Sequence, residues 1–350
     1  MDVGWHERTA TCDGLDGAIR CNESLNCDIF AIKAFLLHDE TTPMKRTKII
    51  WFVIIALIIA LVGYMAITSK SNNSSSKDGL QIVAAENFWG NIASQIGGDK
   101  VHVISVVSDP NADPHEFATS TNTARDFAHA KYVILNGVGY DSWGDALIKA
   151  QPENNRTVLK IADAVGKKEG DNPHLWYSPA YVQQAAEHMA ADMSKLDPAH
   201  ASTYKNNLDT FKKTWADYQG QLAAIKKNYA ATKIAATEDI FEYTAAAAGF
   251  DVISPRSFMQ AVAESNDPPT ESIAGFQKQL QNKEPALLVY NQQTSTPLTE
   301  SLKKLATDND IPVVGITETM PEGAPSFQDW MNTQLTAIQR YISKEDHSNQ

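Results

Sequence analysis

Short apolar runs separated by helical patterns divide the chain after residue 80 into two series. Strands are predicted in the first series at Gln81–Glu86, Val101–Val107, Tyr132–Asn136 and Val158–Ile161. Strands are predicted in the second series at Lys233–Thr237, Asp251–Ser254, Ala286–Tyr290 and Val313–Ile316. Strands that alternate with helices indicate parallel sheets, whose ligand crevice lies at the C-terminal strand ends.

The second series also contains four clear helical patterns. They are predicted near Phe241–Ala248, Thr270–Asn282, Thr299–Asp308 and Phe327–Ile342. The two series match in scale and in order of elements, although their sequences are not similar. We therefore expect an α/β protein with two lobes.

Between the two series, an apolar stripe predicts one long helix. Its members recur at alternating spacings of four and three residues: Tyr204, Leu208, Phe211, Trp215, Tyr218, Leu222, Ile225 and Tyr229. Asp197 as N-cap and Pro198 at the first helical position predict its start. Roughly thirty residues make a helix of about 45 Å. A coiled-coil partner helix is one interpretation, but the flanking α/β patterns favour a rigid strut along two lobes.

One segment is too apolar for a soluble protein. Residues 49–67 (IIWFVIIALIIALVGYMAI) carry no charge and can just span a bilayer, and basic residues directly before them should stay in the cytoplasm. A polar tether over 68–79 follows. A convincing Ala-x-Ala site is missing, so we interpret the run as an uncleaved anchor, with a cleaved signal peptide as the alternative. Either way, we expect the later residues outside the cytoplasmic membrane.

Residues 1–43 fit poorly in front of an export segment, because such signals begin at the N-terminus. Met44-Lys45-Arg46 is a natural beginning, so we expect translation to start at Met44 and residues 1–43 to be a non-native upstream extension. The cysteines all fall in this stretch, at Cys12, Cys21 and Cys27. The exported part therefore has no disulfide or thiolate chemistry.

Length and composition limit the classes of protein to which the chain can belong. A chain of 350 residues is long enough for about two ordinary domains, and 43% hydrophobic with 21% charged residues is typical of a soluble globular protein. The net charge of −12 argues against a nucleic-acid partner, because a protein surface that binds phosphates needs an excess of Lys and Arg.

Two histidine motifs of the same design carry the first candidate chemistry. They are Asp-Pro-His-Glu-Phe around His115 and Asn-Pro-His-Leu-Trp around His174. Proline fixes its own φ and holds the preceding residue extended, so both histidines are predicted on stiff turns. A stiff turn suits an imidazole that must be aimed at a metal ion before the ion arrives. We interpret the two motifs as parts of one site.

Two carboxylates complete this set from the second series. Glu238 directly follows the strand predicted at 233–237, and Glu318 follows the strand predicted at 313–316. Both therefore lie at C-terminal strand ends, where a crevice facing the first lobe is expected. With His115 and His174 they make a site of two imidazoles and two carboxylates, one pair from each lobe.

Further short motifs accompany these residues. They are Ala85-Glu86-Asn87-Phe88-Trp89, Ile134-Leu135-Asn136-Gly137, Ser178-Pro179, Thr237-Glu238-Asp239-Ile240-Phe241-Glu242-Tyr243, Tyr290-Asn291-Gln292-Gln293-Thr294, and Ile316-Thr317-Glu318-Thr319 with Trp330. In combination with the histidine motifs, they resemble the solute-binding proteins of bacterial ABC importers for zinc and manganese, over about residues 80–343. Carried over by position, the family's four metal ligands fall on His115, His174, Glu238 and Glu318.

The resemblance implies a fold and partners. It implies two α/β lobes, each a mostly parallel sheet flanked by helices, joined by one long backbone helix with the ion between the lobes. It also implies a membrane permease and its ATPase subunit as partners, and we expect the protein to be monomeric. The expected organisation is an upstream extension 1–43, a signal or anchor and tether 44–79, an N-terminal lobe 80–196, a linking helix 197–230, a C-terminal lobe 231–343 and a tail 344–350.

The sequence departs from this family in three ways. No lipid-bearing Cys follows the apolar run, the His-rich loop of many zinc-specific members is absent, and Glu238 stands where those members usually offer a His. Carboxylate oxygens suit the harder manganese ion, while imidazole suits zinc. The expected cargo is Mn2+ or Zn2+, and the ligand set favours Mn2+.

Two alternative functions remain for such a sequence. A surface adhesin of the same fold is the first, and it is compatible with metal binding. An extracellular metallohydrolase is the second, but it needs an open metal position and a general base. Neither a His-Glu-x-x-His motif nor a serine nucleophile elbow occurs, so we expect the protein not to be an enzyme.

Overall fold

The structure is a computed structural model that describes residues 79–109, 117–152 and 155–348. The predicted anchor, the upstream extension and His115 therefore lie outside the described residues. Among the residues that are described, no helix is both long enough and apolar enough to cross a membrane.

The N-terminal lobe is built on a parallel sheet of four strands in the order β2-β1-β3-β4. Its strands are β1 (Leu80–Glu86), β2 (Val101–Val107), β3 (Tyr132–Leu135) and β4 (Thr157–Lys160). Both faces of this sheet are covered, as a parallel sheet requires. On β1, Ile82 and Ala84 face one apolar cluster while Val83 and Ala85 face another, which is the two-residue period of a strand.

Helices cover the two faces of this sheet. On one face lie α4 (Thr121–His129) and α5 (Ser142–Ala150), which supply Phe127 and Trp143 to the smaller cluster. On the other face lie α3 (Asn87–Gly97), the short α6 (Ile161–Ala164) and α7 (Pro179–Leu196). The 3-10 turns η1 (Gly98–Lys100), η2 (Leu175–Tyr177) and η3 (Pro198–His200) connect elements of the lobe.

The C-terminal lobe repeats this plan with a parallel sheet in the order β6-β5-β7-β8. Its strands are β5 (Lys233–Ala236), β6 (Asp251–Val252), β7 (Leu288–Asn291) and β8 (Val313–Ile316). Its helical segments are η4 (Asp239–Phe241), α9 (Glu242–Ala248), α10 (Arg256–Ala263), α11 (Thr270–Gln281) and α12 (Pro297–Asp308). The two parallel sheets confirm the fold class expected from the sequence.

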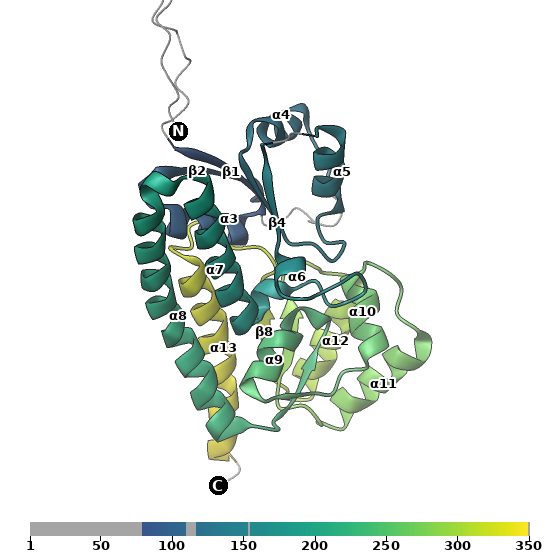
Figure 1. Ribbon diagram of the computed structural model, residues 1–350. Helices are drawn as coiled ribbons and strands as arrows, with labels where there is room; N and C mark the ends of the chain where they lie inside the picture. The colour runs from purple at the N-terminus through teal and green to yellow at the C-terminus, as the bar shows by residue number, and fades with distance from the viewer. Residues whose placement is uncertain (1–78, 110–116, 153–154, 349–350) are drawn as a thin grey trace, which may run out of the picture. The chain divides into compact units, whose positions relative to one another are not determined.

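The long helix α8 (Ala201–Tyr229) has 29 residues and runs alongside α7 of the first lobe and the C-terminal helix α13 (Figure 1). Six members of the predicted stripe are fully buried, while Leu208 and Tyr229 are partly buried against the same core. Trp215 stacks on Tyr218 at 4.4 Å between ring centroids and contacts Phe327 of α13 at 5.5 Å. The strut interpretation is therefore correct, because this stripe packs within the protein.

The long helical segment starts at Pro198 as predicted, but its first turn is 3-10 and lacks the predicted side-chain cap. Asp197 and Pro198 begin the 3-10 turn η3, and α8 itself begins at Ala201. The Asp197 carboxylate caps no backbone N–H there. Instead, its Oδ2 accepts hydrogen bonds from His200 Nδ1 and the Tyr204 hydroxyl, both at 2.7 Å. The carboxylate thus accepts from side-chain donors close to the helix start in place of the predicted backbone N–H.

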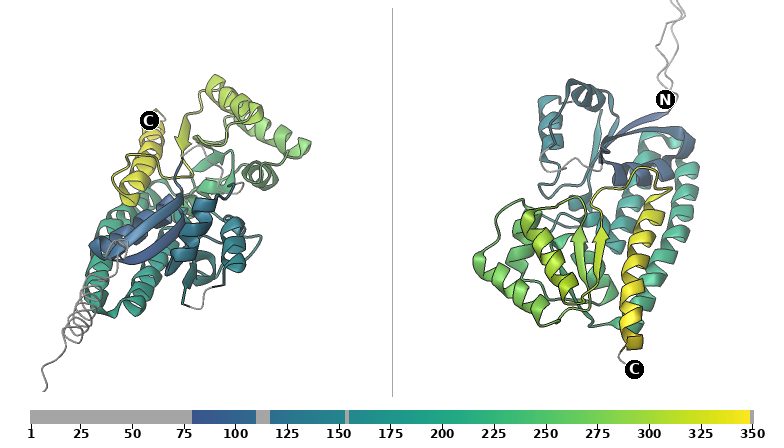
Figure 2. Two further views of the ribbon diagram at one scale, coloured as in Figure 1. Left: turned by 90° about the horizontal axis from the view of Figure 1, so that it is seen from above. Right: turned by 180° about the vertical axis from the view of Figure 1, so that it is seen from behind.

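The C-terminal helix α13 (Phe327–Ser348) also corrects two expectations. It continues into the segment that was predicted as a tail over 344–350. It also leaves its own lobe, since it packs beside α8 and its first turn reaches α3, as the view from behind shows (Figure 2). Gln328 Oε1 accepts from Gln95 Nε2 at 2.9 Å, and Phe327 N donates to Asn91 Oδ1 at 3.0 Å. The lobes are therefore tied by two helices.

Candidate metal site

Three of the four predicted ligands are described, and each lies close to the end of a strand or 3-10 turn. His174 precedes η2 in the N-terminal lobe, Glu238 follows β5, and Glu318 follows β8. All three side chains are buried, with relative exposures of 1%, 2% and 8%. Burial of polar groups is costly unless they have partners, so their contacts are informative.

The imidazole of His174 is held by the residue two positions before it. Asn172 Oδ1 accepts from the backbone N–H of His174 at 2.9 Å and lies 2.9 Å from its Nδ1. Pro173 between them fixes the local backbone, as the sequence motif predicted. The ring is therefore oriented by its Nδ1, which leaves Nε2 to face the crevice.

The carboxylate of Glu318 accepts hydrogen bonds from both lobes. Tyr140 of the N-terminal lobe donates its hydroxyl to Oε1 at 2.8 Å, and Asn291 at the end of β7 donates Nδ2 to Oε2 at 2.9 Å. The backbone N–H of Glu318 donates to Gln293 Oε1 at 2.6 Å. These contacts fix the loop after β8 on the neighbouring strand end.

His174 and Glu318 face each other across the two lobes. Nε2 of His174 lies 3.9 Å from Oε1 of Glu318. Two metal–ligand bonds of about 2.1 Å can span up to about 4.2 Å, so one ion fits between these atoms. Nitrogen and carboxylate oxygen are donors that both Zn2+ and Mn2+ accept.

Glu238 belongs to the same buried region. Its backbone is extended, with φ −154° and ψ 172°, directly before η4. Burial raises the pKa of the Tyr177 hydroxyl well above its usual value, and the nearby charges of Glu318 and Glu238 raise it further. Tyr177 therefore lies close enough to both carboxylates for each to act on it electrostatically.

The ligand set is not assembled within the described residues alone. Among them, no three His, Cys, Asp or Glu side chains lie close enough together to hold a metal ion. His115, the fourth predicted ligand, is outside the described residues. The structure thus places His174 opposite Glu318 and buries Glu238 at the end of β5. The complete set of four ligands stays a prediction.

Aromatic rings form an apolar wall behind this site. Trp176 stacks on Phe88 at 4.1 Å between centroids, and its ring also lies 5.3 Å from His174 and 5.0 Å from Tyr140. Such a wall excludes water and lowers the local dielectric, so interactions between charges are stronger than in solvent. A dication at this site would be attracted strongly by buried carboxylates.

Sequence reasoning missed the residues that orient the ligands. Tyr140 and Asn291 hold Glu318, and Asn172 holds His174. Asn172 and Asn291 carried a usable signal, because Asn172 lies two residues before a predicted ligand and Asn291 belongs to one of the short motifs quoted above. Tyr140 gave none, since 178 residues separate it from Glu318.

A second pair of carboxyl groups lies at the C-terminal strand ends of the N-terminal lobe. Glu86 ends β1 and is fully buried, and its carboxyl interacts with that of Asp141, which is 1% exposed. Asp141 also accepts from the backbone N–H groups of Asn136 at 2.6 Å and Gly137 at 2.9 Å. Burial raises the pKa of Asp141 to about 6, and burial with the Asp141 charge raises that of Glu86 well above its usual value. Both carboxyl groups therefore favour the protonated form more than exposed carboxyl groups do.

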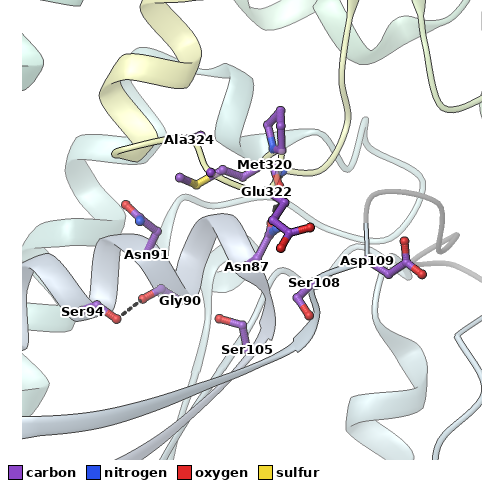
Figure 3. A pocket seen from close by; sticks show the side chains of 12 residues that line it. Asn87, Gly90, Asn91, Ser94, Ser105, Ser108, Asp109, Met320, Glu322 and Ala324 are labelled. Atoms are coloured by element: carbon purple, nitrogen blue, oxygen red, sulfur yellow. Dashed lines mark hydrogen bonds between the residues drawn. The ribbon is translucent and has the colours of Figure 1, made fainter.

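A polar pocket of about 780 Å³ borders the loop after Glu318. Asn87, Gly90 and Ser94 line it from α3, Ser105 and Asp109 from β2 and its end, and Met320 to Ala324 from the facing loop (Figure 3). Asn87 joins the two sides, since its Nδ2 donates to Met320 O at 2.7 Å. The pocket thus lies between the lobes beside a ligand-bearing loop.

Comparison with protein families gives one match that covers most of the chain. The family model described as zinc-uptake complex component A, periplasmic, matches residues 82–341. Among curated proteins, the metal ABC transporter substrate-binding lipoprotein ScbA of Streptococcus cristatus is 24% identical over an alignment of 324 residues that covers 86% of this chain and all of that protein. The manganese ABC transporter substrate-binding lipoprotein PsaA of Streptococcus pneumoniae is 24% identical over 74% of this chain and 86% of its own length.

Solved structures share the fold. The solute-binding protein FpvC of Pseudomonas aeruginosa, in complex with Mn2+, has a TM-score of 0.64 at 18% identity and covers 76% of this chain and 99% of its own. The Cd-bound periplasmic metal-binding protein of Candidatus Liberibacter asiaticus has a TM-score of 0.62 at 17% identity, covering 75% of this chain and 98% of its own. These similarities support the two-lobe architecture described above.

Proposed function

The chain belongs to the family of periplasmic zinc-uptake complex component A, and on this premise we propose that it is the solute-binding component of an ABC importer. In this role it captures a divalent metal ion between its lobes and delivers the ion to a membrane permease that an ATPase subunit drives. The observation that carries the proposal is the opposition of His174 Nε2 and Glu318 Oε1 at 3.9 Å, one from each lobe.

The proposed ligands are His115, His174, Glu238 and Glu318. Two neutral imidazoles and two carboxylates balance one dication, so the closed site is nearly neutral. This balance matters because an uncompensated buried charge is strongly unfavourable. Glu238 supports the set by its burial directly after β5, and His115 by the Asp-Pro-His turn that it shares in design with the motif of His174.

We propose Mn2+ as the natural cargo, with Zn2+ as the competing ion. A carboxylate can bind through both oxygens and raise the coordination number above four, whereas Zn2+ prefers four ligands in a tetrahedron. PsaA is named as a manganese transporter component and FpvC was solved with Mn2+. Because intrinsic affinity follows the Irving–Williams order, Zn2+ should still bind more tightly in vitro.

Metal analysis of protein purified without added metal, with competition between the two ions, tests this function. We expect one ion per chain, and binding of Mn2+ that Zn2+ displaces. Absence of binding for both ions would refute the capture of a metal ion. An ion with an exchangeable bound water would instead favour the metallohydrolase alternative, because catalysis needs an open position.

We propose that residues 49–67 hold the protein at the outer face of the cytoplasmic membrane. The relatives ScbA and PsaA are named as lipoproteins, but this chain has no Cys just after its apolar run. An uncleaved helix would replace the lipid, with residues 68–79 as tether. N-terminal sequencing of the native protein tests this: a start near residue 70, with protein free in the medium, would refute the anchor.

A further inference from the structure

The imidazole of His174 faces two acceptors on the side away from the crevice. Asn172 Oδ1 lies 2.9 Å from Nδ1, and Asp239 Oδ1 lies 3.3 Å from the same nitrogen. The Asp239 side chain is 14% exposed, and its Oδ1 is buried with no hydrogen-bond partner among the described residues. A buried carboxylate oxygen without a hydrogen bond needs an explanation.

The amide of Asn172 can take only one orientation here. Its Nδ2 donates to the backbone carbonyl of Asp239 at 2.7 Å and to Glu242 Oε2 at 3.2 Å, and both of these atoms accept only. Oδ1 must therefore point at His174. Because Asn172 Oδ1 and a carboxylate oxygen are both acceptors, the proton of the neutral imidazole belongs on Nδ1. Nε2 then presents its lone pair toward Glu318.

The chain places Asp239 behind the imidazole for a simple reason. Glu238 is extended, and Asp239 begins the 3-10 turn η4, so the backbone changes direction between them. Glu238 is buried directly after β5, while Asp239 lies behind His174. A histidine that binds a metal through one nitrogen while its other nitrogen faces a carboxylate is oriented and made a stronger donor.

We propose that Asp239 is a positioning residue that, together with Asn172, holds His174 in the Nδ1–H form and strengthens Nε2 as a metal ligand. This inference rests on the proposed function, because it assigns a role toward the ion that His174 would bind. Asp239 itself does not touch the ion, since it faces the nitrogen opposite to the crevice. It adds a negative charge close to the site without occupying a coordination position.

The substitution Asp239→Asn tests the role of the charge, because it keeps the size of the side chain and removes the carboxylate. We expect the affinity for Mn2+ and for Zn2+ to fall by about 10- to 100-fold, the range usual for such partners of metal-bound histidines. Asp239→Glu, which restores the carboxylate, should recover part of the loss. Glu264→Gln is the matched control, because it removes an exposed carboxylate from the pocket that Asp239 also lines.

The tautomer is measured separately, by 15N NMR of the ring nitrogens of His174 in the metal-free wild-type protein. We expect a protonated Nδ1; a protonated Nε2 would overturn the proposal even if the variants fail to fold. Wild-type affinity in Asp239→Asn would also overturn it, and so would an equal loss in Glu264→Gln. If the proposed function is wrong, the result is distinguishable. The wild-type protein would then bind neither Mn2+ nor Zn2+, while NMR would still show a protonated Nδ1 in His174.

Discussion

The hydroxyl of Tyr140 in the N-terminal lobe donates a hydrogen bond of 2.8 Å to Oε1 of Glu318 in the C-terminal lobe. The same oxygen lies 3.9 Å from Nε2 of His174, which makes it the atom that an incoming ion would contact. A metal ion bound to this oxygen would therefore compete with the Tyr140 hydroxyl for it. This hydrogen bond therefore couples the contact between the two lobes to the binding of an ion by Glu318.

Removing this hydroxyl with Tyr140→Phe should destabilise the metal-free protein more than the metal-bound protein. Loss of a buried hydrogen bond to a charged acceptor costs about 1.5–3 kcal/mol, whereas a bound ion would still neutralise the carboxylate. Urea unfolding with and without Mn2+ measures both effects. Tyr204→Phe is the control, because it removes a 2.7 Å bond to Asp197 away from the site. Equal losses with and without metal in Tyr140→Phe would mean that the ion does not replace this bond.

Substitution of either predicted histidine ligand should weaken metal binding. His174→Ala and His115→Ala each remove one donor, and we expect a loss on the order of a few kcal/mol in the free energy of binding, because the carboxylates stay buried but less well neutralised. Titration calorimetry with a competing chelator measures it. His129→Ala is the control, since His129 is exposed at the end of α4. Similar losses in all three variants would show that the effect is structural.

The choice between the two ions should depend on Glu238. In Glu238→His, three imidazoles and one carboxylate approach the tetrahedral set that Zn2+ prefers, so the ratio of zinc to manganese affinity should rise. Calorimetric titration of both ions into both proteins gives the ratio. An unchanged ratio would mean either that Glu238 is not a ligand or that the shape of the cavity sets the preference.

The buried pair of Glu86 and Asp141 predicts a pH dependence of stability. Both carboxyl groups have a raised pKa in the folded protein. The stability that they contribute is therefore fully present at pH values below their pKa in the unfolded chain, which is near 4, and it is lost as the pH rises. For Asp141, with a pKa of about 6, the loss occurs between about pH 4 and 6 and amounts to about 3 kcal/mol.

Glu86→Gln tests this dependence, because an amide keeps a hydrogen-bond donor beside Asp141 and does not titrate. We expect a higher free energy of unfolding above pH 6 and a smaller decline with pH than in the wild type. Urea unfolding of the metal-free protein between pH 4.5 and 8 measures both. Glu300→Gln serves as the exposed control, because its neighbours Ser295 and Lys303 lower the pKa of Glu300. A decline as steep as in the wild type would contradict the prediction.

Metal binding should change the dimensions of the protein only slightly. The lobes are bridged by α8 and by α13, so opening should be a small tilt with local rearrangement of the ligand loops. A large decrease in radius of gyration on adding Mn2+, measured by small-angle scattering, would refute this. At a thousandfold excess over the dissociation constant, linkage should still add about 4 kcal/mol of stability, seen as a rise in melting temperature.

The sequence by itself determined the order of strands and helices and the positions of the candidate ligands along it. All eight described strands overlap the predicted ones, because a buried strand leaves a short apolar run that needs no tertiary information. The apolar stripe of α8 could be predicted in the same way, from the spacing of its apolar residues. The sequence also placed Glu238 and Glu318 after β5 and β8, since the carboxyl ends of parallel strands share one edge.

The sequence did not reveal every local element. The helix α10 (Arg256–Ala263) was not predicted, although Phe258, Met259 and Val262 form its buried side. It lasts only 8 residues and begins directly after Pro255, which left too short a pattern to separate from a loop. The side-chain cap predicted for Asp197 was wrong, because its carboxylate accepts from the side chains of His200 and Tyr204 and not from a backbone N–H.

Only the tertiary structure decided which distant residues meet. Periodicity reports that one face of an element is buried, but it does not say against which partner. The contact of Tyr140 with Glu318, the approach of Asp239 to His174 and the bond between Gln95 and Gln328 all depend on how the two lobes dock. Hydrogen bonds between residues far apart in the chain leave no periodic trace, so the contact of Tyr140 with Glu318 could not be predicted from the sequence.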